Sequence, residues 1–232
     1  MVLPQLDEAG ERPVIESWHR ERGRRERSRA GRRGHPAPLG PVSGYGDGMP
    51  DRPISADRDA ERRRLAADLV AAAYLRGDFV LSSGRRSDHY FDKYRFETRP
   101  DLLRRLGRLL AGLVPPDVDG LAAPELGAVL LGGAVSLELG LPLVIVRREA
   151  KGYGTSRVIE GELTPGARLA LIEDVVTTGG QAVAAARRLR EAGATVARLI
   201  AVIDREEGGE ARIRAEGLDY QPLFRSRDLP LP

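Results

Sequence analysis

Residues 168–181, with the sequence RLALIEDVVTTGGQ, constrain the fold of this chain more than any other stretch. The apolar run 168–173 predicts a buried parallel strand that ends in two adjacent carboxylates, Glu173 and Asp174. A turn of small residues, 177–180, then leads into a helical pattern. In an open α/β sheet, ligands bind at the carboxyl ends of the strands. We therefore expect the two acids and the turn to face one bound molecule.

A sugar phosphate fits both parts of this motif. The backbone N–H groups of residues 177–180 and the positive end of the following helix suit a phosphate, while Glu173 and Asp174 can accept hydrogen bonds from ribose hydroxyls. A solvated strand end followed by a plain turn is the alternative. The motif has no Gly-Lys-Ser/Thr and no Gly-x-Gly-x-x-Gly, which disfavours an ATPase and a dehydrogenase.

Short apolar strands alternate with helices around this motif, which predicts an α/β fold with an open parallel sheet and helices on both faces. Strands are expected at 120–123, 143–146, 168–173, 196–203 and 221–224. Helices are expected at 128–139 and 182–192, and the first of these is so apolar that it is expected to be buried.

A small hood of one helix and one β-hairpin is expected before the sheet, near residues 55–97. The helix begins at residue 55 and is expected to stop at Gly77. The hairpin strands are expected at 79–81 and 88–94. Pro100 then opens a further helix that reaches about position 113.

Residues 1–50 are predicted to be a disordered extension rich in Arg, Gly and Pro, followed by a single domain at 51–232. Their composition buries too little apolar surface to offset chain entropy. Residues 1–48 hold nine arginines and seven acids, so only +1 of the chain's +3 net charge belongs to the rest. Binding to nucleic acid is therefore not expected, except through residues 1–48. Met49 opens the ordered-looking part and is a candidate start of translation.

The chain contains no cysteine, which excludes disulfides, thiolate metal ligands and a cysteine nucleophile. No apolar run is long enough to cross a bilayer, and the first residues do not resemble a secretory signal. We expect a cytoplasmic protein without a membrane association. Among 37 basic residues only Lys93 and Lys151 are lysines, which makes both positions candidates for a specific role.

Residues 147–165 interrupt the alternation of strands and helices. They lack an apolar period and contain several cations, and glycines flank Tyr153. A long connection of this kind inside a compact domain is typical of a functional loop. We expect it to close as a lid over an anion.

Three motifs together resemble a known family. Residues 171–181 resemble the motif by which type I phosphoribosyltransferases bind 5-phosphoribosyl 1-pyrophosphate (PRPP). The hairpin segment 83–91 and the loop segment 147–154 resemble those of the orotate phosphoribosyltransferases in particular. The resemblance extends over about residues 56–228 and implies a type I phosphoribosyltransferase-like fold.

The resemblance implies an enzyme, a pentosyltransferase of de novo pyrimidine biosynthesis. It would convert orotate and PRPP to orotidine 5′-monophosphate and pyrophosphate with Mg²⁺, which PRPP itself would mainly hold, so that no metal ligand is expected in the protein. In this family the loop closes over the active site of the neighbouring subunit. The resemblance therefore implies a homodimer with shared active sites.

Carried over to this sequence, the family's motifs imply three groups of site residues. The catalytic residues would be Lys151, Asp174 and Glu173. The residues that bind PRPP would be Arg147, Arg148, Lys151, Tyr153, Glu173, Asp174, Val175, Val176, Thr177, Thr178, Gly179, Gly180 and Gln181. The residues that bind orotate would be Tyr90, Phe91, Thr177 and Arg205. The turn 124–127 would offer backbone N–H groups to pyrophosphate through a strained peptide bond.

Three positions depart from the family pattern. Tyr153 stands where many members have a histidine, and Ser82 and Leu126 stand where a lysine is common. Two cations of the usual set are thus missing. His89 is expected to be a packing residue of the hairpin rather than a base.

Two alternatives stay open at this point. Another base phosphoribosyltransferase would keep the PRPP motif. A PRPP-sensing or RNA-binding regulator would use the same fold without turnover.

Overall fold

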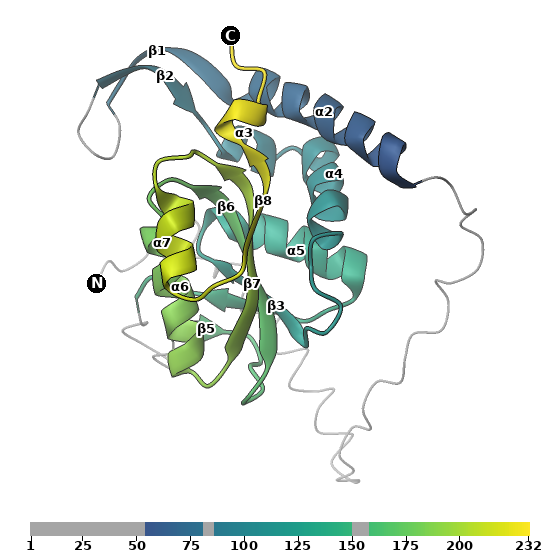
Figure 1. Ribbon diagram of the computed structural model, residues 1–232, viewed down its shortest axis with the longest axis vertical. Coiled ribbons are helices and arrows are strands. Elements are labelled where there is room, and N and C mark those ends of the chain that lie inside the picture. The colour runs from purple at the N-terminus through teal and green to yellow at the C-terminus, as the bar shows by residue number, and fades with distance from the viewer. Residues whose placement is uncertain (1–53, 81–85, 150–157) are drawn as a thin grey trace, which may run out of the picture. The chain divides into compact units, whose positions relative to one another are not determined.

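A six-stranded sheet of order β5-β4-β3-β6-β7-β8 forms the centre of the fold (Figure 1). The structure, a computed structural model, describes residues 54–80, 86–149 and 158–232. The strands are β3 (Gly120–Pro124), β4 (Leu143–Val146), β5 (Ile159–Glu160), β6 (Arg168–Val176), β7 (Thr195–Asp204) and β8 (Tyr220–Arg225). All neighbours pair in parallel except β4 with β5. The predicted α/β class is confirmed.

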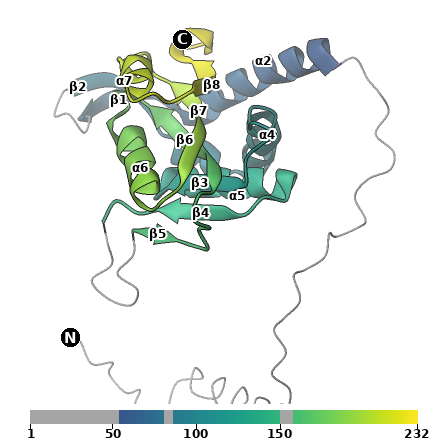
Figure 2. The ribbon, with the colours of Figure 1, turned by 60° about the horizontal axis from the view of Figure 1, so that its bottom comes forward.

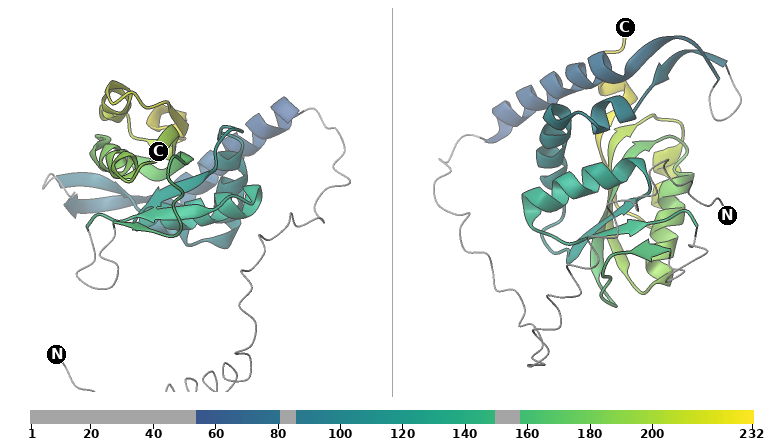
Figure 3. Two further views of the ribbon diagram at one scale, coloured as in Figure 1. Left: turned by 90° about the horizontal axis from the view of Figure 1, so that it is seen from below. Right: turned by 180° about the vertical axis from the view of Figure 1, so that it is seen from behind.

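Helices cover both faces of this sheet (Figure 2). One face carries α4 (Pro100–Ala111) and α5 (Gly127–Leu139), and the other carries α6 (Gly180–Glu191) and α7 (Gly209–Ala215). Figure 3 shows the same layers from below and from behind. Strand periodicity explains the two layers, because successive side chains of a strand point to opposite faces. Ala170 and Ile172 of β6 lie in the core under α4 and α5, whereas Leu169 and Leu171 lie in the core under α6.

The predicted hood of one helix and one hairpin is present, but its boundaries differ from those expected. It consists of α2 (Ile54–Ala73), β1 (Tyr74–Val80), β2 (Arg86–Phe91) and the short helix α3 (Tyr94–Glu97), which the sequence did not predict. The expected helix stop at Gly77 is wrong. The helix ends at Ala73 because the next residues pair with β2, with Tyr74 opposite Phe91. Gly77 lies inside the irregular part of that ladder.

Helix α5 was expected to be buried, and this is confirmed for one of its faces only. Leu131 and Val135 face the core and are fully buried, whereas Leu130 is exposed and Leu137 is 88% exposed. A helix covers the sheet with one face only, and this apolar helix presents leucines on the opposite face as well. Leu126, at the start of the helix, adds to this exposed apolar stripe.

Three further short elements were not predicted. β5 lies inside the stretch 147–165, which was expected to be a loop throughout, and it pairs antiparallel with β4. Helix α7 and the 3-10 helix η1 (Ser226–Asp228) flank β8. Each is too short to show a clear hydrophobic period in the sequence.

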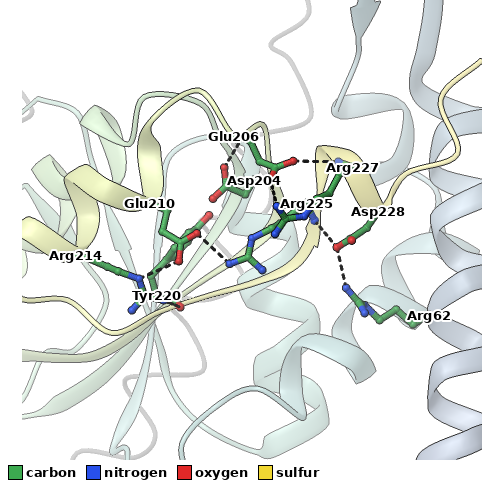
Figure 4. A network of polar contacts seen from close by, with 9 residues as sticks. All are labelled: Arg62, Asp204, Glu206, Glu210, Arg214, Tyr220, Arg225, Arg227 and Asp228. Carbon is green, nitrogen blue, oxygen red and sulfur yellow. Dashed lines mark hydrogen bonds and ion pairs between the residues drawn. The ribbon is translucent and has the colours of Figure 1, made fainter.

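A network of polar contacts joins the carboxyl ends of β7 and β8 to α2 (Figure 4). Arg62 of α2 donates to the backbone oxygen of Leu223 at 2.9 Å and to the carboxylate of Asp228 at 3.1 Å. Its guanidinium also lies 5.3 Å from the ring centre of Phe224. The network therefore fastens the hood helix to the last strand of the sheet.

The predictions for residues 1–50 and for the hairpin turn at 82–85 lie outside the described residues. Within the described part, no helix is long and apolar enough to cross a membrane.

Candidate active site

The site lies at the carboxyl edge of the sheet, next to β3, where the strand order reverses. Strand β4 lies on one side of β3 and β6 lies on the other. The connections after β3 and β6 therefore diverge to opposite faces of the sheet, and it is at such a switch point that open α/β sheets form a ligand-binding crevice. The turn 124–127 borders this crevice from β3, and the turn 177–180 borders it from β6.

Strand β6 is longer than predicted and carries the acid pair within it. It continues to Val176, so Glu173 and Asp174 are held by strand pairing rather than by a turn, and both are buried. The backbone N–H of Asp174 donates to the Glu173 carboxylate at 3.1 Å. Burial, assisted by the neighbouring Asp174 charge, raises the pKa of Glu173 well above its ordinary value.

The turn after β6 exposes the groups that an anion needs. Thr177 and Thr178 are exposed, and α6 begins at Gly180, so the first N–H groups of this helix have no partner within it. Gly179 has a φ of 74°. A Cβ atom there would lie 2.9 Å from the backbone oxygen of Gly209, so both its backbone angle and the close approach of α7 require glycine.

The turn after β3 also lies against the acid pair. The Glu125–Leu126 peptide bond is cis. A Cβ atom on Gly127 would lie 1.8 Å from Oδ2 of Asp174. Only a glycine at this position lets the start of α5 approach the carboxylate so closely.

The first residues of the expected lid loop connect these two turns. The backbone N–H of Arg148 donates to Oε1 of Glu125 at 2.9 Å, and its guanidinium donates to Gln181 at 3.3 Å. Arg147 forms an ion pair with Glu125 at 3.6 Å. The structure thus brings Arg147, Arg148 and Gln181 together at the crevice. Lys151 and Tyr153 lie outside the described residues.

A cavity of about 110 Å³ lies beneath the hairpin. It contains two of the expected orotate residues, Phe91 and Arg205, and its wall is completed by Tyr74, His89, Ile203, Ser226, Leu229 and Leu231. The other two do not line it. Tyr90 points to the opposite side of β2, where its ring packs 5.6 Å from that of Phe79, and Thr177 is exposed in its turn.

His89 packs as expected, because its ring stacks on Tyr74 at 5.6 Å with an angle of 19° between the planes. It also hydrogen-bonds the exposed Asp88 at 2.7 Å.

Two residues of the hood enter the site without having been assigned a role from the sequence. Lys93 reaches Asp174 with its ammonium group, and Glu97 is buried beside them. The rarity of lysine marked Lys93 as unusual. Nothing in the local sequence pattern indicated Glu97.

No group of three or more His, Asp or Glu side chains in the described part of the chain is arranged to hold a metal ion. The acid pair is engaged by protein groups instead, since Asp174 pairs with Lys93. A divalent ion that brings its own oxygen ligands from a bound pyrophosphate fits these residues better than a protein cage would.

Fold and site together define a phosphoribosyltransferase, and residues 97–216 match the family model described as the phosphoribosyl transferase domain. An orotate phosphoribosyltransferase of Thermococcus gammatolerans is 46% identical over 174 residues, which cover 74% of this chain and 92% of that protein. This chain belongs to the orotate phosphoribosyltransferase family.

Solved structures agree with this assignment. The orotate phosphoribosyltransferase of Mycobacterium tuberculosis H37Rv, crystallised with Fe(III) dicitrate, has a TM-score of 0.66 and 32% identity, with coverage of 74% of this chain and 99% of that chain. A crystal structure of the same protein in complex with PRPP has a TM-score of 0.63 and 29% identity, with the same coverage.

Proposed function

We infer that the chain transfers the 5-phosphoribosyl group from PRPP to orotate, which gives orotidine 5′-monophosphate and pyrophosphate in pyrimidine biosynthesis. Membership of the orotate phosphoribosyltransferase family carries this inference, because the 46% identity extends over 92% of a relative with that name. The crevice at the carboxyl edge supports it, because its parts suit the parts of PRPP.

The ribose and its 5′-phosphate are assigned to the end of β6. Glu173 and Asp174 would hold the 2′- and 3′-hydroxyls. Residues 177–181, with the first turn of α6, would bind the 5′-phosphate, because N–H groups and the positive end of a helix attract an anion. Val175 and Val176 belong to the same motif and would shape the floor of the site beneath PRPP.

The orotate ring is assigned to the cavity beneath the hairpin. Arg205 would pair with the orotate carboxylate, because a guanidinium presents two parallel donors to two oxygens. It is half-buried, and its present partner, Glu207, lies 3.4 Å away. Phe91 offers an aromatic wall to the ring. Tyr90 and Thr177 stay predictions as orotate residues.

The chemistry needs charge stabilisation more than a nucleophilic side chain. The bond between the anomeric carbon and pyrophosphate breaks while orotate nitrogen bonds the same carbon. Positive charge develops on the ribose and negative charge on the leaving group. The proposed Mg²⁺ would be held by PRPP oxygens and would neutralise part of the pyrophosphate charge. Arg147, Arg148, Lys151 and Tyr153 would bind the pyrophosphate from the loop.

The active form is proposed to be a homodimer in which the loop of one subunit closes over the site of the other. The exposed apolar stripe of Leu126, Leu130 and Leu137 on α5 supports this proposal, since exposed patches of this kind mark association surfaces. A cytoplasmic location is likewise proposed.

Purified protein mixed with orotate, PRPP and Mg²⁺ tests the function through the loss of orotate absorbance. We expect turnover with orotate and none with adenine or another purine base. Turnover with a purine base instead would support the alternative base phosphoribosyltransferase. PRPP binding without any turnover would support a regulator on the same fold. Chelation of the divalent ion is expected to abolish turnover.

A further inference from the structure

Four ionisable side chains meet where the hood touches the end of β6. Nζ of Lys93 donates to Oδ2 of Asp174 at 2.5 Å. The side chain of Asp174 is 5% exposed and that of Lys93 is 30% exposed. Glu173 precedes Asp174 on the strand, and Glu97 of α3 is completely buried nearby.

The Lys93–Asp174 pair lies against the turn after β3. A Cβ atom on Gly127 would lie 3.0 Å from Nζ of Lys93, in addition to its overlap with Asp174. The ammonium group therefore lies within contact distance of the turn that the proposed function assigns to pyrophosphate. A hood residue reaches the point where ribose and pyrophosphate would meet.

The charges of this cluster do not balance if every acid is ionised. Three carboxyl groups, Glu97, Glu173 and Asp174, would then share one ammonium group in a buried place, which is costly. Neither carboxyl oxygen of Glu97 has a hydrogen-bond donor in the described part of the chain. A buried ionised carboxylate without a donor is unfavourable, whereas a neutral carboxylic acid carries its own proton to donate.

The titration of these groups agrees with that argument. Burial, and then the charge of Asp174, raises the pKa of Glu97 to about 7, although Lys93 opposes the shift. Asp92 also faces Glu97 and raises its pKa slightly further. Burial alone would lower the pKa of Lys93, but the attraction of Asp174 outweighs it and the net shift is upward. Below about pH 7 the favoured form therefore has Lys93 charged and Glu97 neutral.

We propose that Lys93 and Glu97 are positioning residues for PRPP: Lys93 holds the carboxylate of Asp174 in place beside Gly127, and Glu97 serves as a neutral carboxylic acid. Asp174 then presents a carboxylate acceptor to a ribose hydroxyl. A neutral Glu97 keeps a further negative charge away from the phosphates of PRPP. The proposal rests on the proposed function and assigns two residues to its PRPP site.

The test compares Lys93→Met, Lys93→Arg and Glu97→Gln with the wild type. Arg95→Met is the matched control, because Arg95 lies on the same short helix and is exposed. For each protein, kcat and the KM values for PRPP and for orotate are measured from about pH 6 to about pH 8.5, across the range in which Glu97 titrates. Circular dichroism and thermal unfolding show whether each variant is folded.

Lys93→Met is expected to raise the KM for PRPP by about tenfold or more at neutral pH, because Asp174 loses the ammonium partner that holds its carboxylate in place. The KM for orotate should change little. Lys93→Arg, which keeps the positive charge, should recover most of the loss, and Arg95→Met should behave as wild type.

Glu97→Gln imitates the neutral acid and should therefore retain wild-type KM for PRPP at about pH 6. In the wild type, kcat/KM for PRPP should fall above about pH 7, as Glu97 ionises and repels the phosphates. This fall should be absent in Glu97→Gln.

Equal effects of Lys93→Met on both KM values, no recovery with Lys93→Arg, or an unchanged fall above pH 7 in Glu97→Gln would each overturn the proposal. An inactive wild type would instead remove the proposed function itself. The two failures are therefore distinguishable.

Discussion

Glu125 accepts a hydrogen bond from the backbone N–H of Arg148 at 2.9 Å. Glu125 and Arg148 are 23 positions apart in the sequence. Their contact links the turn after β3 to the beginning of the loop that carries Lys151. The loop thus starts at the edge of the crevice, with its first two arginines already held there. The proposed role of Lys151 needs such an anchor, because a lid must return to the same site in every cycle.

Lys151→Ala is expected to lower kcat by about a hundredfold or more, which is the usual effect of removing a group that stabilises transition-state charge. Thermal stability should stay close to that of the wild type, because a loop lysine contributes little to folding. Steady-state kinetics and calorimetry measure the two effects. An unchanged kcat would exclude Lys151 from the mechanism.

Mixing two impaired variants, assayed at a PRPP concentration well below the KM, tests whether the loop acts across a dimer. Lys151→Ala and Asp174→Asn, mixed in equal amounts and allowed to exchange subunits, should recover about a quarter of the wild-type activity, because half of the dimers then contain one intact site. No recovery after demonstrated exchange would mean that each loop serves its own subunit.

Asp174→Asn should impair PRPP use more than Glu173→Gln. Asp174 is the partner of Lys93, whereas the raised pKa of Glu173 favours its protonated form, which glutamine imitates. We expect the KM for PRPP to rise by about tenfold or more in Asp174→Asn, which loses a charge-assisted hydrogen bond. Kinetics with varied PRPP measure this, and equal effects of the two substitutions would contradict the ordering.

Arg205→Ala should raise the KM for orotate by about tenfold or more, because a charge-assisted hydrogen bond to the carboxylate is lost. The KM for PRPP should stay within about threefold of the wild-type value. Arg205→Lys keeps the charge but not the two parallel donors, so its KM for orotate should lie between those of the wild type and Arg205→Ala. A larger rise in the KM for PRPP than in the KM for orotate would show that Arg205 does not bind the orotate carboxylate.

Folding stability should depend on pH through Glu97. Its pKa is raised from 4.5 to about 7 in the folded state, so the folded state binds the proton more tightly than the unfolded state does. This stabilisation is complete below about pH 4.5 and is lost as the pH rises to about 7, which amounts to about 3 kcal/mol. Urea unfolding at about pH 5 and about pH 8 should show a smaller loss in Glu97→Gln than in the wild type, because the raised pKa of Glu173 contributes to the loss in both proteins.

Leu137→Glu should weaken the proposed dimer, since it places a charge in the apolar stripe on α5. Arg104→Glu is the control, because Arg104 is an exposed residue of α4 outside that stripe. Sedimentation at several concentrations measures both. A dimer that tolerates Leu137→Glu would place the interface on another surface.

The sequence predicted those parts of the fold that follow from local periodicity. The strand before Glu173 and the helix after Pro100 were predicted near their observed positions, because each has an apolar pattern of the right length and a clear start or stop signal. The end of α2 was misplaced because Leu75 fits a helical stripe as well as it fits a strand. Only the pairing of Tyr74 with Phe91 decides between them.

The site was predictable where its residues lie together in the sequence. The acid pair and the turn after it form one continuous motif. Lys93 lies 81 positions before its partner Asp174, so no local pattern could reveal that contact. Glu97 looks like an ordinary surface acid of a short helix until the packing of the hood buries it.

The contact of Arg62 with Leu223 and Asp228 has a consequence for the synthesis of the chain. Leu223 and Asp228 lie 161 and 166 positions after Arg62. The final contacts of α2 can therefore form only after almost the whole domain has left the ribosome. Contacts so distant in sequence form late and slowly. Until then the apolar face of α2, with Leu65 and Leu69, has no finished core to enter. The nascent hood therefore keeps apolar surface exposed until the synthesis of the domain is nearly complete.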